Sequence, residues 1–130
     1  MAQGLGTREL AYLGDAVFEL MVREKLVSAQ ISFSQLNSAA DKLVCAKAQA
    51  DMYHRIFTKL TKVEQSVIKR GRNLHGGRGA KTACMSDYRH ATGLEVLFGY
   101  LYASGELDRL KELFSLCMEN ERTQSPWTTR

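Results

Sequence analysis

An acidic residue lies in the middle of an apolar segment near the N-terminus. Residues 8–20 read RELAYLGDAVFEL, and apolar side chains cover more than half of the helical wheel, which predicts a helix buried on most sides. Asp15 and Glu19 share the remaining strip, because residues four apart lie on the same face of a helix. Such acids bind a cation, pair with a base or cap a helix. Pairing with Arg8 and Arg23 explains them as well as a cation site does.

A second acid, Glu95, falls among apolar residues with helical spacing. The periodicity over residues 91–102 puts Glu95 on the face that we expect to be buried. An isolated carboxylate there is costly, so it needs a base, a proton or a metal as its partner. Gly93 and Gly99 flank it and leave room for close approach of another element. The spacing does not say whether Glu95 and Asp15 meet.

Basic residues cluster in the centre of the chain. No acid occurs between Glu64 and Asp87, and this segment carries a charge of +5 in a chain with a net charge of +4, so the rest sums to −1 (4 − 5). The five basic residues are Lys69, Arg70, Arg72, Arg78 and Lys81. Four glycines within residues 71–79 let the backbone approach a phosphate closely. The pattern favours a phosphate-contacting patch; an ordinary solvated loop is the alternative.

These residues would be positioned by helices. The chain has a single proline, Pro126, and few alternating segments, which predicts an all-α fold of about five to seven helices. The predicted helices cover residues 7–27, about 33–60 as one long helix that can bend, 62–72 behind a Thr61–Glu64 capping box, 87–104 with Ser86 as N-cap, and 106–121.

The composition predicts one compact domain over residues 1–130, with residues 123–130 as a frayed tail. The three cysteines, Cys45, Cys84 and Cys117, are far apart and lack metal-ligand spacing, which favours a reducing intracellular setting. No apolar run reaches membrane-spanning length and no signal-peptide pattern is present, so we expect no membrane partner and a cytoplasmic location. An organellar origin after removal of a transit segment is the alternative.

Four segments resemble one known family. The sequence LGDAV at 13–17 resembles the signature of the ribonuclease III catalytic domain, and its continuation by Phe18 and Glu19 resembles Mini-ribonuclease III. The segments CAKAQA at 45–50, KRGRN at 69–73 and YRHATGLEVLFGYLY at 88–102 resemble the same family. The resemblance extends from Glu9 to about Leu113, so we expect no double-stranded-RNA-binding domain of the kind that follows in ordinary ribonuclease III.

The resemblance implies that Asp15 and Glu95 are the catalytic residues and bind Mg²⁺, with Mn²⁺ as an alternative. A hard cation held by carboxylates neutralises the phosphodiester, activates water and stabilises the leaving 3′-oxygen. The implied activity is an endoribonuclease that cuts structured double-stranded RNA, such as a ribosomal RNA precursor, to 5′-phosphate and 3′-hydroxyl ends. Glu19 is a further candidate through a water-mediated contact; its pairing with Arg23 is the alternative.

The resemblance also implies a homodimer in which each protomer cuts one strand, and the apolar excess on the first helix fits a symmetric contact. The expected RNA-binding residues are Lys69, Arg70, Arg72, Asn73, Arg78 and Lys81, because duplex RNA is recognised mainly by its shape and backbone. Tyr88 and Arg89 either position RNA or pack near a helix start. Lys47 and Gln49 either face nucleic acid or are solvated.

Three positions depart from full-length ribonuclease III. Ala11 and Thr92 stand where that family has acids, and Phe33 lies near the position of a third acid. Mini-ribonuclease III shares this thinner set. The departures motivate an alternative, a non-catalytic ribonuclease III-like module that binds RNA; a third is a helical interaction dimer indifferent to RNA.

Overall fold

The computed structural model describes residues 4–74 and 83–119, and within these ranges its regular secondary structure consists of helices, without strands. The predicted all-α fold is therefore confirmed. The elements are α1 (Thr7–Ser28), the short 3-10 helix η1 (Phe33–Gln35), α2 (Leu36–Val44), α3 (Ala46–Phe57), α4 (Lys62–Arg72), α5 (Ala83–Ala103) and α6 (Leu107–Met118).

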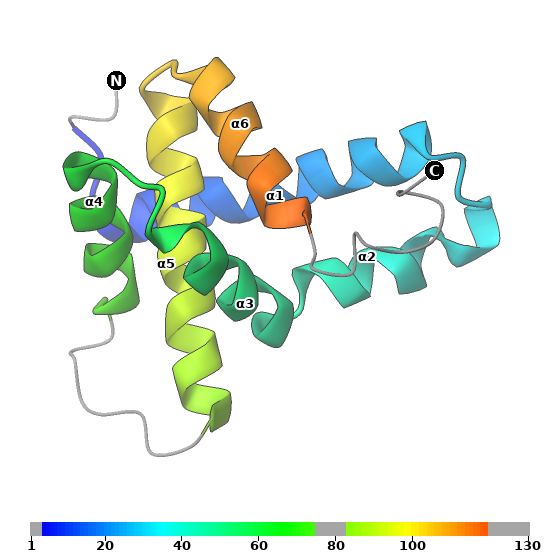
Figure 1. Ribbon diagram of the computed structural model, residues 1–130, viewed down its shortest axis with the longest axis horizontal. Coiled ribbons are helices and arrows are strands. Elements are labelled where there is room, and N and C mark those ends of the chain that lie inside the picture. The colour runs from blue at the N-terminus through cyan, green and yellow to red at the C-terminus, as the bar shows by residue number, and fades with distance from the viewer. Residues whose placement is uncertain (1–3, 75–82, 120–130) are drawn as a thin grey trace.

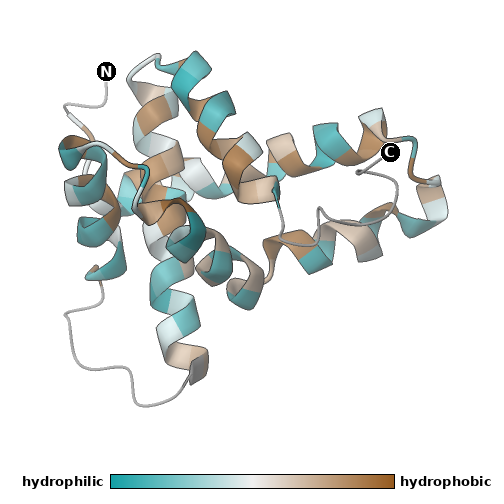
Figure 2. Cartoon of the chain, viewed as in Figure 1, coloured by the Kyte–Doolittle hydropathy of each residue, from teal (hydrophilic) through white to brown (hydrophobic). Residues whose placement is uncertain are grey.

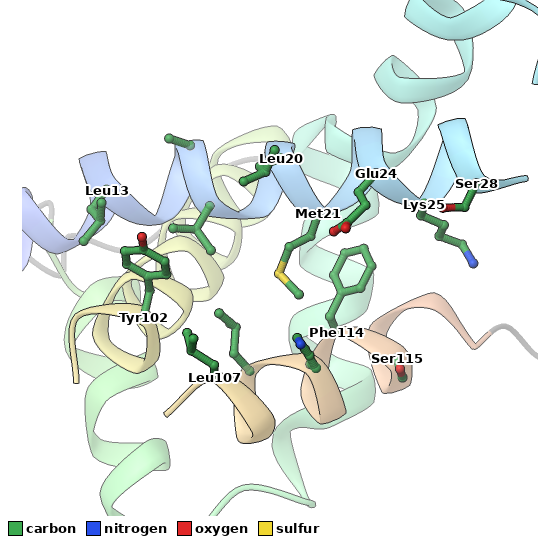
Figure 3. A pocket seen from close by; sticks show the side chains of 14 residues that line it. Leu13, Leu20, Met21, Glu24, Lys25, Ser28, Tyr102, Leu107, Phe114 and Ser115 are labelled. Carbon is green, nitrogen blue, oxygen red and sulfur yellow. The ribbon is translucent and has the colours of Figure 1, made fainter. Parts of the chain in front are cut away.

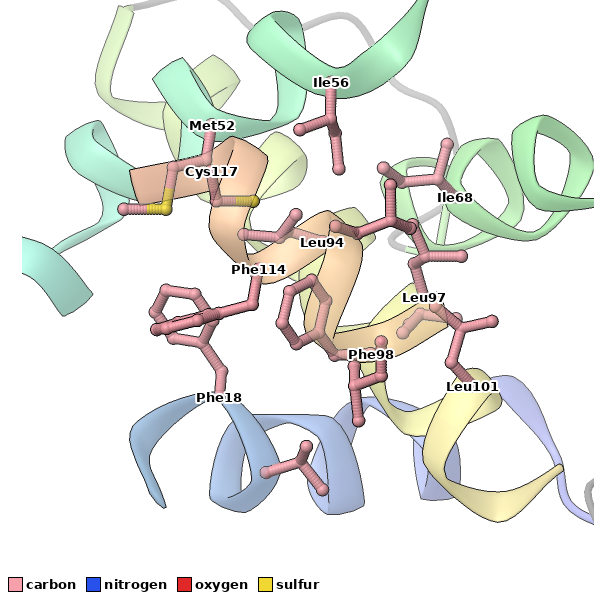
Figure 4. Close-up of a cluster of buried hydrophobic side chains, with 14 of the residues drawn as sticks. Phe18, Met52, Ile56, Ile68, Leu94, Leu97, Phe98, Leu101, Phe114 and Cys117 are labelled. Atoms are coloured by element: carbon pink, nitrogen blue, oxygen red, sulfur yellow. The ribbon is translucent and has the colours of Figure 1, made fainter. Parts of the chain in front are cut away.

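Helix α5 is the central element. Figure 1 shows α1 crossing it, while α3, α4 and α6 also lie against it and α2 runs back beside α1. The core forms around the buried face of α5, as Figure 4 shows. The ring of Phe18 on α1 packs edge-on against Phe98 on α5 and Phe114 on α6, with centroid distances of 5.4 and 5.9 Å. The core therefore joins the first, fifth and last helices.

The prediction of one long helix over about 33–60 is wrong. The backbone of Cys45 is extended, with φ −67° and ψ 159°, and it separates α2 from α3. Because α2 packs on α1 whereas α3 packs on α5, the chain must change direction at this point. The apolar spacing continues through the break because both helices bury one face.

Local signals placed the other helix ends with mixed success. The Thr61–Glu64 capping box is present in both directions: Glu64 N donates to Thr61 Oγ1 at 3.1 Å, and Thr61 N donates to Glu64 Oε1 at 2.9 Å. Gly105, with φ +75°, follows the end of α5. Helix α5 begins at Ala83, so Ser86 is not its N-cap; the Ser86 hydroxyl lies within hydrogen-bonding distance of His90 Nδ1 instead.

Candidate functional site

The crossing of α1 and α5 is closed by two glycines. A Cβ atom built on Gly14 would lie 1.7 Å from the main-chain oxygen of Glu95, and one on Gly99 would lie 2.1 Å from the main-chain oxygen of Leu10. The two helix backbones are therefore in direct contact. This contact brings Asp15, the residue after Gly14, to the turn of α5 that carries Glu95.

Asp15 and Glu95 form an interacting pair of carboxyl groups. The pKa of Glu95 is raised to about 7, mainly by burial and to a lesser degree by the charge of Asp15 and a hydrogen bond shared with it. Asp15 itself is exposed. The Asp15 side chain therefore faces solvent, while the Glu95 carboxyl group keeps its proton to a higher pH than an ordinary glutamate because its charge is poorly solvated.

Gln49, on α3, also lies beside the carboxyl pair. Its side chain is only 2% exposed and hydrogen-bonds the Glu95 carboxyl group, which lowers the pKa of Glu95 and partly offsets the three raising effects. The expectation that Gln49 faces RNA or solvent is therefore wrong, because α3 turns this residue toward α5. Lys47 is exposed, and its Nζ lies 3.4 Å from Asp51 Oδ1.

The carboxyl pair fits a hard divalent cation. Carboxylate oxygens are the ligands that Mg²⁺ prefers, and Mg²⁺ keeps several waters, so two protein ligands suffice. A cation would also relieve the repulsion that raises the Glu95 pKa. Within residues 4–74 and 83–119, no cluster of three or more His, Cys, Asp or Glu side chains could hold a metal.

The three departures from ribonuclease III supply no further acid near this pair. The Thr92 hydroxyl donates to the main-chain oxygen of Tyr88 at 3.0 Å. Phe33 lies on η1 with 89% of its surface exposed. Ala11 packs partly buried against the core.

The remaining candidates near the pair have other surroundings. The Glu19 carboxylate forms an ion pair with Arg23 at 3.1 Å, which is the alternative to a metal contact that the sequence also allows. Tyr88 and Arg89 lie inside α5 rather than at its start, so the helix-start packing expected for them is wrong. Half of the Tyr88 surface is exposed. The Arg89 Nε atom is buried and has no hydrogen-bond partner among the residues that the structure describes.

The C-terminal end of α4 carries the basic residues. A Cβ atom on Gly71 would lie 2.7 Å from Val96 Cβ, so this end of α4 packs beside the turn of α5 that holds Glu95. Lys69 and Arg70 are exposed. The Lys69 ammonium also lies 5.6 Å from the centroid of the Phe57 ring.

Arg72 is held in place by its neighbours. Its Nε donates to Asn73 Oδ1 at 3.1 Å, and its Nη1 donates to the Tyr53 hydroxyl at 3.4 Å. Two of the predicted RNA contacts, Arg78 and Lys81, lie outside the described residues.

Sequence reasoning also missed a histidine pair between α3 and α5. The centroids of the His54 and His90 rings are 4.5 Å apart, and the Tyr53 ring packs edge-on against His90 with a centroid distance of 4.6 Å. Burial and, to a lesser degree, His90 lower the pKa of His54. The two residues are far apart along the chain, so no spacing signal points to the pair.

An apolar groove runs between α1 and α6 (Figure 3). Its volume is about 580 Å³, and Leu13, Met21 and Phe114 are among the residues that line it. Leu20 at the groove is 66% exposed, and Tyr12 on the same helix is 87% exposed. The expected burial of α1 on most sides is therefore wrong for Leu20. Figure 2 shows apolar residues along both helices that border the groove.

Comparisons with known proteins agree with this architecture. The family model described as "Ribonuclease III domain" matches residues 8–106. A Mini-ribonuclease 3 of Brevibacillus brevis is 45% identical over 105 residues, covering 80% of this chain and 78% of the relative. One of Enterococcus faecalis is 41% identical over 113 residues, covering 85% and 86%. A Fusobacterium nucleatum protein solved by X-ray crystallography has a TM-score of 0.74 at 28% identity, covering 85% of this chain and 89% of the other.

Proposed function

The chain belongs to the ribonuclease III domain family, and on this premise we propose that it is a Mg²⁺-dependent endoribonuclease of the Mini-ribonuclease III kind. The observation that carries the proposal is the meeting of Asp15 and Glu95 at the α1–α5 crossing. These two side chains would hold the cation, and Mn²⁺ is an alternative to Mg²⁺. The exposed Asp15 carboxylate would meet the ion from solvent, and Glu95 would give up its proton as the ion binds.

When bound, Mg²⁺ supplies neutralisation of the phosphodiester charge, activation of a water and stabilisation of the leaving 3′-oxygen. The proposed products carry a 5′-phosphate and a 3′-hydroxyl. The substrate is double-stranded or structured RNA, which the proposal takes to be a ribosomal RNA precursor in the cytoplasm. The basic end of α4 supports this substrate class, since Lys69 and Arg70 are exposed next to the turn of α5 that carries Glu95.

The enzyme would act as a homodimer formed through the groove between α1 and α6. Leu20 and Tyr12 would be buried against a second copy, because large exposed apolar side chains gathered along one helix mark an interaction surface. A symmetric pair would place two carboxyl pairs on one duplex, one for each strand. No described helix is long and apolar enough to cross a bilayer.

The departures at Ala11 and Thr92 favour a second candidate, a ribonuclease III-like module that binds RNA without cutting it. Labelled duplex RNA incubated with Mg²⁺ separates the two. If the protein is an enzyme, the wild type cuts the RNA, and Asp15→Asn abolishes cutting while its RNA affinity stays within a few-fold of wild type. The control variant Asp41→Asn, on the exposed side of α2, cuts as the wild type does. Equal binding without cutting by the wild-type protein and Asp15→Asn would favour the binding module.

A further inference from the structure

Gln49 is a buried amide whose side chain reaches a proposed metal ligand. Its main-chain N already donates to Cys45 O at 3.0 Å at the start of α3, and its side chain hydrogen-bonds Glu95 on α5. We propose that Gln49 is a positioning residue for the proposed metal site, whose side-chain N–H donates to Glu95 and holds that carboxylate toward Asp15. This inference rests on the proposed function and deepens it.

The geometry makes a donor at this position useful. A glutamate side chain has three rotatable bonds, so fixing its carboxylate for metal binding costs conformational entropy. A carboxylate accepts several hydrogen bonds, so it can keep one from Gln49 and still direct its other oxygen to a cation. Asp15, in contrast, is shorter and exposed. Glu95 is therefore the ligand whose orientation depends on a neighbour.

A residue that orients a metal ligand has a different signature from one that only fills the core. Loss of such a partner costs about 10- to 100-fold in metal affinity or activity, and more metal restores the reaction. A purely structural amide would change stability and leave the metal affinity of the folded protein unchanged. The two roles can thus be separated in one variant.

The test is Gln49→Met, which keeps a linear side chain but removes the donor. Mn²⁺ binding to the RNA-free protein is measured by isothermal titration calorimetry, and duplex cleavage is measured against Mg²⁺ concentration. We expect the Mn²⁺ Kd and the half-saturating Mg²⁺ concentration to rise about 10- to 100-fold, with the rate at saturating Mg²⁺ close to wild type. The matched control is Gln65→Met, because the half-buried Gln65 donates to a main-chain oxygen, Leu60 O, at 3.4 Å.

Folded Gln49→Met protein with wild-type Mn²⁺ affinity would overturn this inference alone. A loss of cleavage that Mg²⁺ does not restore would also overturn it. If circular dichroism shows that Gln49→Met is unfolded, the same titrations on Gln49→Ala decide by the same outcomes. A wild-type protein that neither binds Mn²⁺ nor cuts RNA would overturn the proposed function and this inference together.

Discussion

A Cβ atom on Gly14 would overlap the main-chain oxygen of Glu95, at a separation of 1.7 Å. The neighbouring atom in this contact is backbone, which cannot rotate away as a side chain does. The glycine therefore sets how close α1 and α5 lie, and Asp15 follows it directly in the chain. The packing of two helices and the meeting of two acids are thus one structural feature.

We expect Gly14→Ala to lower the free energy of unfolding by about 3 kcal/mol or more, because the helices must move apart to admit a methyl group. Urea unfolding monitored by circular dichroism measures the change. The control is Gly4→Ala, since a Cβ atom there meets nothing within 4 Å. Equal unfolding midpoints for Gly14→Ala and the wild type would contradict the direct backbone contact between α1 and α5 at Gly14.

The raised pKa of Glu95 predicts a pH dependence of stability in metal-free protein. The folded pKa is about 7 and the ordinary value is 4.5, so between these values the folded state binds the proton more tightly than the unfolded state. The contribution of Glu95 to the free energy of unfolding is therefore fully present below about pH 4.5, falls as the pH rises toward 7, and then levels off. The difference between the two pKa values corresponds to a loss of at most about 3 kcal/mol in the free energy of unfolding.

Glu95→Gln should lack this component, because its amide is neutral at every pH. We expect its stability relative to the wild type to increase by about 2 kcal/mol between pH 4.5 and pH 8 in the presence of a chelator. Chemical denaturation across this range measures it. Glu24→Gln, on the exposed side of α1, is the control, and a pH-independent difference for Glu95→Gln would contradict the raised pKa of Glu95.

The basic end of α4 predicts a salt-dependent contact with RNA. Arg70→Ala should weaken duplex binding and reduce the slope of log K against log salt by about one phosphate contact. Filter binding at several salt concentrations, without divalent cations, gives the slope. Lys62→Ala removes an exposed charge at the opposite end of the same helix and should leave the slope unchanged. An unchanged slope for Arg70→Ala would place the RNA surface elsewhere.

The groove between α1 and α6 predicts that a charge at Leu20 disrupts the proposed dimer. Leu20→Arg should elute and sediment as a monomer, because a buried unpaired guanidinium is costly at an interface. Val63→Arg is the matched control, since Val63 is similarly exposed, at 60%, but lies on α4. Light scattering after size exclusion gives the mass, and a monomeric wild-type protein would contradict the dimer.

Local chemistry was well predicted from the sequence. The Thr61–Glu64 capping box and the stop at Gly105 depend on residues within a few positions of each other, and both are present. The break at Cys45 was missed because the apolar spacing continues through it. The predicted N-cap at Ser86 is wrong, because α5 starts at Ala83 and the Ser86 hydroxyl lies beside His90 within the helix.

The sequence by itself determined the helical class, the family resemblance and the two acids that stand out within apolar segments. Periodicity reports which face of a helix a residue occupies, so Asp15 and Glu95 were visible as exceptions to it. Only the tertiary structure decided that they meet, that Gln49 joins them from α3 and that Leu20 stays exposed. These facts depend on which helices pack together and how closely, and for α1 and α5 that closeness comes from backbone contact at Gly14 and Gly99.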